Sequence, residues 1–114
     1  MKPHYLADGQ HRAVVLDLCM EMAMSLGPKA FELQSRALAR RVDQTKTLSE
    51  VRCPSLILCG REDRLCPVTR HELMHDLMPG SELAIIEGAG HLPVLEQPDH
   101  TNAALSAWLD RTDK

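Results

Sequence analysis

The sequence predicts an α/β fold in which a helical segment is followed by two parallel strands with flanking helices. Apolar residues recur at helical intervals up to about residue 42. After Cys53-Pro54 they instead form two short continuous runs, at 55–59 and 82–86, which are typical of buried strands. A stretch of helical length separates the two runs, and strands joined by a helix pair in parallel.

Two helices are expected first, at 12–26 and 28–42. Gly27-Pro28 ends one and begins the other, because proline suits the first turn of a helix. We expect the pair to form an α-hairpin with its apolar residues turned inward. These residues are Val15, Leu18, Cys19, Met22 and Leu26 in the first helix, and Phe31, Leu38 and Val42 in the second.

The remaining elements follow in chain order. Thr47 and Glu50 have the spacing of a capping box, which predicts a short helical turn. Pro67 opens the helix between the strands, and Pro79-Gly80 ends it. The expected elements are a turn at 47–50, a strand at 55–59, a charged turn at 61–64, a helix at 67–78, a strand at 82–86, a glycine-rich loop at 88–93 and a helix at 98–109.

Two strands are too few for an independent parallel sheet, because such a sheet is buried on both faces and has further strands beside it. We therefore expect these strands to form the edge of a larger sheet, and the chain to be incomplete.

The composition excludes several classes of protein. The 114 residues make one domain at most, with 25% charged and 44% apolar residues, as in ordinary soluble proteins. A net charge of −3 argues against nucleic-acid binding. The first residues lack the apolar core of a secretion signal, and no apolar run approaches the ~20 residues of a membrane helix. The four cysteines show no C-x-x-C spacing, so reduced thiols in a cytoplasmic protein are expected.

The candidate catalytic residues are Asp63 and His91, which follow the two expected strands. Parallel strands end at the same edge of a sheet, where ligands bind. Gly88 and Gly90 would allow the tight loop that aims His91 out of the sheet. An aspartate at the neighbouring strand end can hold one imidazole nitrogen and stabilise the imidazolium formed in acyl transfer. Glu62, the residue before Asp63, is the rival candidate for the acid.

Three segments carry a family resemblance: PSLILCGREDRLCP (54–67), LMPGSELAIIEGAGHLPVLEQPD (77–99) and NAALSAWL (102–109). They closely resemble the C-terminal part of the α/β-hydrolase fold family, in its esterase- and lactonase-like branch. The resemblance implies that Asp63 is the acid and His91 the base of a catalytic triad. It also implies that residues 1–46 are a helical cap or lid-like segment and that residues 47–114 are the C-terminal part of the hydrolase core. Glu96 is expected to cap or pack against the last helix.

The family's nucleophile is not found here, because no G-x-S-x-G elbow occurs in the sequence. The resemblance implies hydrolysis of a carboxylic ester or lactone by a Ser-His-Asp mechanism, without a cofactor and with the serine supplied from elsewhere. The isolated chain is then expected to be nearly inert until an N-terminal hydrolase half joins it. Alternatively, the chain is a non-catalytic remnant that covers its open sheet edge by self-association.

A third reading comes from His71-Glu72-Leu73-Met74-His75, which matches the zinc-binding H-E-x-x-H pattern. A catalytic zinc ion needs a third protein ligand, and the extended motif would place a histidine where Ser81 stands. The helix that carries the motif also lies away from the expected strand ends. We therefore interpret the match as coincidental and expect no metal site.

Overall fold

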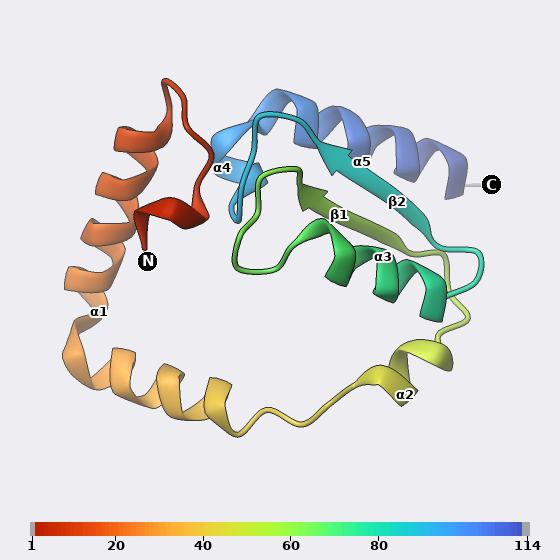
Figure 1. Cartoon of the computed structure of the whole chain (residues 1–114), viewed down its shortest axis with the longest axis horizontal. Coiled ribbons are helices and arrows are strands. Elements are labelled where there is room, and N and C mark those ends of the chain that lie inside the picture. Colours follow the sequence, from red (N-terminus) through yellow and green to blue (C-terminus); the bar gives the residue numbers. More distant parts are fainter. Residues whose placement is uncertain (1, 113–114) are drawn as a thin grey trace.

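The structure is a computed structural model that describes residues 2–112. Figure 1 shows its elements in chain order. They are η1 (Pro3–Tyr5), α1 (Arg12–Ala39), α2 (Thr45–Ser49), β1 (Leu56–Gly60), α3 (Val68–Leu77), β2 (Glu82–Ile86), α4 (Pro93–Glu96) and α5 (Pro98–Thr112). The predicted α/β fold is confirmed, and both strands begin within one residue of their expected positions.

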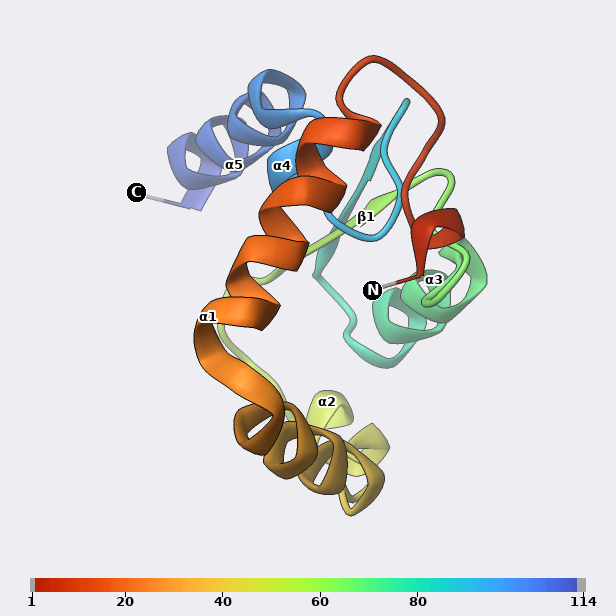
Figure 2. The ribbon, with the colours of Figure 1, turned by 90° about the vertical axis from the view of Figure 1, so that its left-hand side faces the viewer.

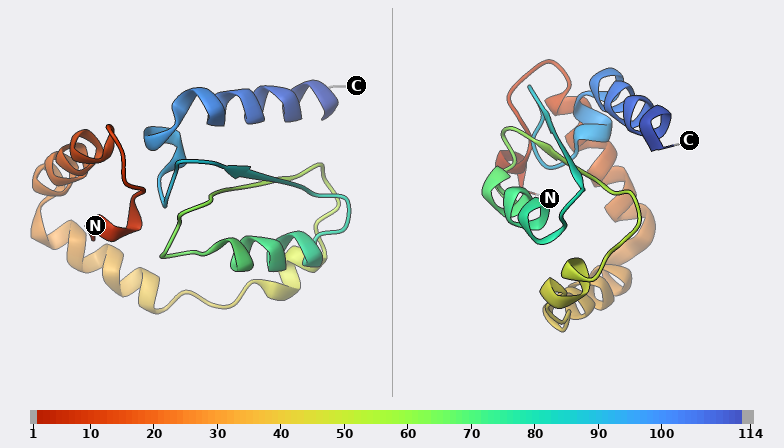
Figure 3. Two further views of the ribbon diagram at one scale, coloured as in Figure 1. Left: turned by 45° about the horizontal axis from the view of Figure 1, so that its top comes forward. Right: turned by 90° about the vertical axis from the view of Figure 1, so that its right-hand side faces the viewer.

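The sheet consists of β1 and β2, paired in parallel from Leu56 opposite Glu82 to Gly60 opposite Ile86. The crossover helix α3 packs against one face, and α5 packs against β2 on the other (Figures 2 and 3). The buried side chains of Ile57, Cys59 and Ile86 make the centre of the core. No third strand occurs in residues 2–112. Cys59 and Ile86 lie near the carboxyl ends of the strands, so the core is concentrated at the edge of the sheet that precedes Asp63 and His91.

Helix α1 bends at Gly27, and the expected α-hairpin is wrong. Its two halves diverge instead of folding back on each other (Figures 1 and 2). Gly27 is the only residue within α1 with non-helical backbone angles (φ 84°, ψ 171°), whereas a helical hairpin needs a loop of about 2–5 residues to reverse the chain. Within residues 2–112, most of the apolar stripe therefore has no helix packed against it. Val15 is buried, but the side chains of Leu18, Met22, Leu26, Phe31, Leu38 and Val42 are exposed.

The short helix α2 begins at Thr45, two residues earlier than expected, and the predicted capping box does not form. The Asp43 carboxylate accepts hydrogen bonds from the Thr45 hydroxyl (2.7 Å) and the Thr45 backbone N–H (3.2 Å). The hydroxyl bond and the backbone bond together hold the pKa of Asp43 below its usual value. This Asx-type turn starts the helix, so Thr47 lies inside it.

The N-terminal segment was not predicted to be structured, yet it packs against the core. Leu6 and Ala7 are among the buried apolar residues, with 3% and 6% of their surface exposed. In Figure 1 this red segment reaches from the start of α1 to the loop before α4. It therefore borders the strand ends where the candidate catalytic residues lie.

Candidate active site

Asp63 lies in a turn that is tied to the end of the neighbouring strand. The Arg61 N–H donates to the Ile86 carbonyl (3.0 Å) and the Glu62 N–H to the Ala89 carbonyl (2.9 Å). The Asp63 side chain points inward and only 7% of the residue is exposed, whereas Arg61, Glu62 and Arg64 are exposed. Of the four charged residues in this turn, only Asp63 is buried, and the rival acid Glu62 faces solvent.

The Asp63 carboxylate is held by two backbone donors and by the His91 ring. Its Oδ1 accepts from the backbone N–H groups of Leu65 (3.0 Å) and Cys66 (2.8 Å). Nδ1 of His91 lies 3.1 Å from Oδ2 and 3.3 Å from Oδ1. Because a carboxylate can only accept, this contact places the proton of neutral His91 on Nδ1 and leaves Nε2 as the basic nitrogen.

His91 is partly open to solvent, with 28% of its side chain exposed. Its backbone N–H donates to the Tyr5 carbonyl at 2.7 Å, and the Tyr5 ring lies 6.4 Å from the imidazole, centroid to centroid. Within residues 2–112, no hydroxyl or thiol is hydrogen-bonded to Nε2. The two predicted residues are therefore brought together, with the basic nitrogen free to meet another group.

Gly90 precedes His91 at a point of close backbone approach. A Cβ at this position would overlap the Tyr5 carbonyl oxygen and would lie 2.8 Å from the Ala7 nitrogen. The requirement for glycine at position 90 is thus imposed by the N-terminal segment.

Glu96 was missed as part of the site. It was expected to cap or pack against the last helix, but its carboxylate turns to the His91 loop and is 3% exposed. One oxygen accepts from the Ala7 N–H, and the other accepts from the N–H groups of Gly90 and Leu92. Glutamate is common at the start of a helix, so no sequence signal separates this role from helix capping.

Cys59 is the buried thiol nearest to this pair in the chain. Its burial, together with the negative charge of Asp63, raises the pKa of the thiol above its ordinary value. A raised pKa disfavours the thiolate, which is the nucleophilic form, so Cys59 is a poor candidate for the missing nucleophile.

The H-E-x-x-H helix is α3, and its histidines have separate partners. His71 Nδ1 lies 3.2 Å from the Pro67 carbonyl and His75 Nδ1 lies 2.8 Å from the Ser81 hydroxyl. Among the described residues, no group of three histidine, cysteine, aspartate or glutamate side chains is arranged to hold a metal ion. The described part of the chain therefore supplies no third ligand to the two histidines of α3, which a catalytic zinc site needs.

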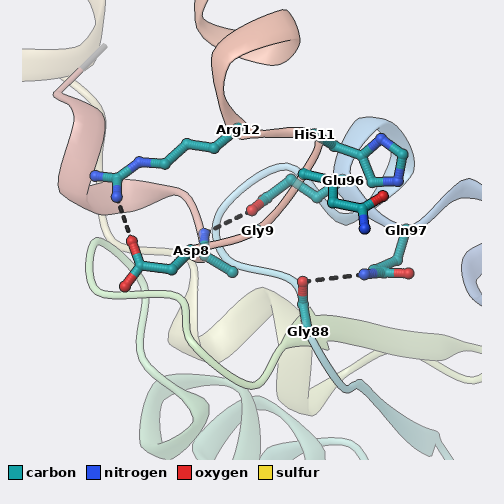
Figure 4. A pocket seen from close by; sticks show the side chains of 9 residues that line it. Asp8, Gly9, His11, Arg12, Gly88, Glu96 and Gln97 are labelled. Atoms are coloured by element: carbon teal, nitrogen blue, oxygen red, sulfur yellow. Dashed lines mark hydrogen bonds and ion pairs between the residues drawn. The ribbon is translucent and has the colours of Figure 1, made fainter.

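A small polar pocket lies beside Glu96, where the start of α1 meets the His91 loop. Figure 4 shows Arg12 paired with Asp8 and the Gln97 amide donating to the Gly88 carbonyl, with Glu96 between them. Neither Asp63 nor His91 is among the residues that line this pocket.

The comparisons with known proteins bear on the family and the fold of the matched part. No family model matches the chain. It is 33% identical to a proline iminopeptidase of Heyndrickxia coagulans over 74% of its length, and 32% identical to a pimeloyl-[acyl-carrier protein] methyl ester esterase of Xanthomonas axonopodis pv. citri over 72%. A thermophilic esterase from Thermogutta terrifontis matches 67% of this chain in structure, with a TM-score of 0.64 and 37% identity. Over this matched part, the chain belongs to the α/β-hydrolase family.

The match covers a minor part of each relative. The chain spans 28% of the iminopeptidase, 32% of the methyl ester esterase and 28% of the Thermogutta esterase. The two strands and their helices are thus a portion of the α/β-hydrolase fold. None of the helices in residues 2–112 has both the length and the hydropathy needed to cross a bilayer.

Proposed function

We propose that Asp63 and His91 are the acid and the base of a Ser-His-Asp triad whose serine lies outside this chain, and that the reaction is hydrolysis of a carboxylic ester or lactone. The observation that carries the proposal is the contact of His91 Nδ1 with the buried Asp63 carboxylate, which leaves Nε2 basic and partly exposed. That arrangement suits a general base that must receive a proton from a nucleophile.

In this mechanism His91 Nε2 takes the serine proton as the serine oxygen attacks the carbonyl carbon. The imidazolium then gives that proton to the departing alkoxide oxygen, leaving an acyl-serine. A water molecule attacks the acyl-serine with His91 again as base, which frees the acid and restores the serine. Asp63 holds the imidazole ring through Nδ1, while two backbone amides bind the other side of the carboxylate.

The source of the serine follows from the missing part of the fold. The chain contains no G-x-S-x-G sequence, and the stretch that it shares with the iminopeptidase and the methyl ester esterase makes up only 28% and 32% of those proteins. A nucleophile-bearing N-terminal half, joined to this chain or bound to it, would supply the serine and the oxyanion donors. Residues 1–46 would act as the cap over the acyl site, and residues 47–114 as the C-terminal part of the core. The isolated chain would be almost inactive.

An esterase assay with paired histidine variants tests the proposal. Hydrolysis of 4-nitrophenyl butyrate is measured for the chain expressed alone and for the protein isolated from its native source. We expect the chain alone to match its His91→Ala variant, and the native preparation to hydrolyse the ester and to lose that activity with His91→Ala. His75→Ala, which removes a histidine of α3 away from the site, is the control and should retain activity. Native activity that survives His91→Ala would contradict the proposal.

A further inference from the structure

Three consecutive backbone N–H groups around His91 are bound by two acceptors. Gly90 and Leu92, on either side of the histidine, donate to Oε2 of Glu96 at 3.0 and 2.9 Å. The N–H of His91 itself donates to the Tyr5 carbonyl at 2.7 Å. The peptide groups on both sides of His91 therefore depend on one carboxylate oxygen.

The other oxygen of Glu96 ties the same loop to the N-terminal segment. Oε1 accepts from the Ala7 N–H at 2.7 Å, so Glu96 receives three backbone hydrogen bonds in total. Tyr5 and Ala7 thus hold the loop from one direction, through the His91 N–H and through Glu96. The Pro93 carbonyl of α4 accepts from the buried Thr101 hydroxyl (3.0 Å), which fixes the helix that carries Glu96.

The charge of Glu96 has no cationic partner in the described residues. The nearby Arg12 guanidinium instead pairs with Asp8 (Figure 4). It also donates to the Pro3 carbonyl. A charge buried to this degree is tolerated because three amide dipoles point at it. A role limited to packing would not need a carboxylate, whereas three donors converging from two segments do need its lone pairs.

We propose that Glu96 is a positioning residue for His91. It fixes the peptide groups before and after the histidine and locks them to the Tyr5–Ala7 segment, so that the ring meets Asp63 through Nδ1. The importance of this role for catalysis rests on the proposed function, but the effect of Glu96 on the orientation of the His91 ring does not.

Replacing Glu96 with glutamine should release the ring. The amide retains one acceptor oxygen and presents an NH2 group to at least one of the three N–H donors. The loop must then shift to separate the donors, and His91 Nδ1 leaves the Asp63 carboxylate. The measurable consequence is loss of the protected Nδ1–H proton, because an imidazole N–H that is not hydrogen-bonded exchanges rapidly with water.

Proton NMR of the 15N-labelled full chain tests this at low temperature. We expect a downfield His91 Nδ1–H resonance in the wild type, assigned by its absence in Asp63→Ala. It should be lost in Glu96→Gln while the backbone amide spectrum stays dispersed. Glu87→Gln, which removes an equal charge from an exposed carboxylate just before the loop, should retain it. An unchanged resonance in Glu96→Gln, or equal loss in Glu87→Gln, would overturn the proposal.

Glu96→Asp keeps the experiment decisive if Glu96→Gln does not fold. This variant preserves the charge but is one methylene too short to reach both segments at once. We expect a folded chain whose Nδ1–H resonance is weakened or shifted, and an unchanged resonance would contradict the positioning role. The NMR test uses no substrate, so a negative result would reject the positioning role of Glu96 without rejecting the esterase proposal. Likewise, a protein without esterase activity could still show the predicted loss of the Nδ1–H resonance.

Discussion

The Asp63 carboxylate uses its two oxygens for different tasks. Oδ1 binds the backbone N–H groups of Leu65 and Cys66, while Oδ2 makes the shorter contact with His91. In Asp63→Asn, the two backbone donors would keep the amide oxygen at the Oδ1 position. The NH2 group would then face Nδ1 and force the imidazole proton onto Nε2.

Asp63→Asn should therefore remove the base while leaving the fold in place. We expect kcat of the complete enzyme to fall by about 10⁴-fold, the order expected when the base is held in the wrong tautomer. The measurement is ester hydrolysis, with the unfolding midpoint recorded in parallel. Asp110→Asn, an exposed carboxylate in α5, is the control. Retention of wild-type kcat by Asp63→Asn would refute the role of Asp63.

Cysteine reactivity offers a second test at the scale of the residue. Cys59 is buried and its thiol pKa is raised by burial and by Asp63, whereas Cys53 and Cys66 are exposed. At pH 8, iodoacetamide should modify Cys53 and Cys66 at least ~10-fold faster than Cys59, because the thiolate is the reactive species. Peptide mass mapping measures the three rates, and fast labelling of Cys59 in the folded chain would contradict its placement.

The same raised pKa gives a pH dependence of stability. Ionisation of Cys59 is easier in the unfolded chain, so its contribution to stability is complete below the unfolded pKa of the thiol. That contribution declines as the pH rises from there toward the folded value. In Cys59→Ala, the free energy of unfolding measured by urea denaturation should therefore decline less at alkaline pH than in the wild type. An unchanged dependence on pH would contradict this role of Cys59.

At the scale of elements, the bend in α1 depends on one residue. Gly27, with φ 84° and ψ 171°, lies in a region of backbone angles that essentially only glycine adopts. Gly27→Ala should lower the free energy of unfolding by about 1–3 kcal/mol, as measured by urea denaturation. Ser25→Ala, an exposed site with helical backbone in the same element, should change it little. An equal effect of the two variants would mean that the bend imposes no strain.

Elements with a strong local pattern could be predicted, and those fixed by distant contacts could not. The strands at 56–60 and 82–86 are built mainly from consecutive apolar residues, and prolines mark the helices around them. Their order, type and parallel pairing therefore followed from sequence. The α-hairpin was wrong because Gly27-Pro28 encodes a stop but not the direction of the next helix. The placement of Tyr5–Ala7 depends on Gly90 and Glu96, more than 80 residues away in the chain, and no local pattern reports such a contact.

In the candidate site, too, contacts between neighbouring strand ends could be predicted, whereas contacts with backbone amides could not. The proximity of Asp63 and His91 could be predicted because each follows a strand and the two strands are neighbours. The contacts of Glu96 could not be predicted, because its partners are backbone amides, which carry no residue-specific signal.

At the scale of the whole molecule, the chain is more extended than its length requires. Its radius of gyration is 15.8 Å, against about 13 Å for a compact domain of this size. The second half of α1 lies away from the sheet (Figure 1), and large apolar side chains along α1 are exposed. Surfaces of this kind are contact sites for other chains or for further parts of the same fold.

We therefore expect the isolated chain to self-associate as its concentration rises. Phe31, 71% exposed in the second half of α1, is a suitable probe. Phe31→Lys should shift the sedimentation profile toward the monomer without lowering stability. Ser35→Lys adds the same charge to an exposed site on the same helix and should have a smaller effect. A wild-type chain that stays monomeric at high concentration would contradict this expectation.

Asp63 and His91 are proposed to serve a serine that this chain does not carry. The most direct measurement is native mass spectrometry of the protein isolated from its source after treatment with a fluorophosphonate, which labels activated serines. We predict a mass above the 12.7 kDa of this chain, from a longer polypeptide or a bound second one, with the label on a serine outside residues 1–114. A mass of 12.7 kDa or its multiples, with no labelled serine, would contradict the account and leave the pair without a nucleophile.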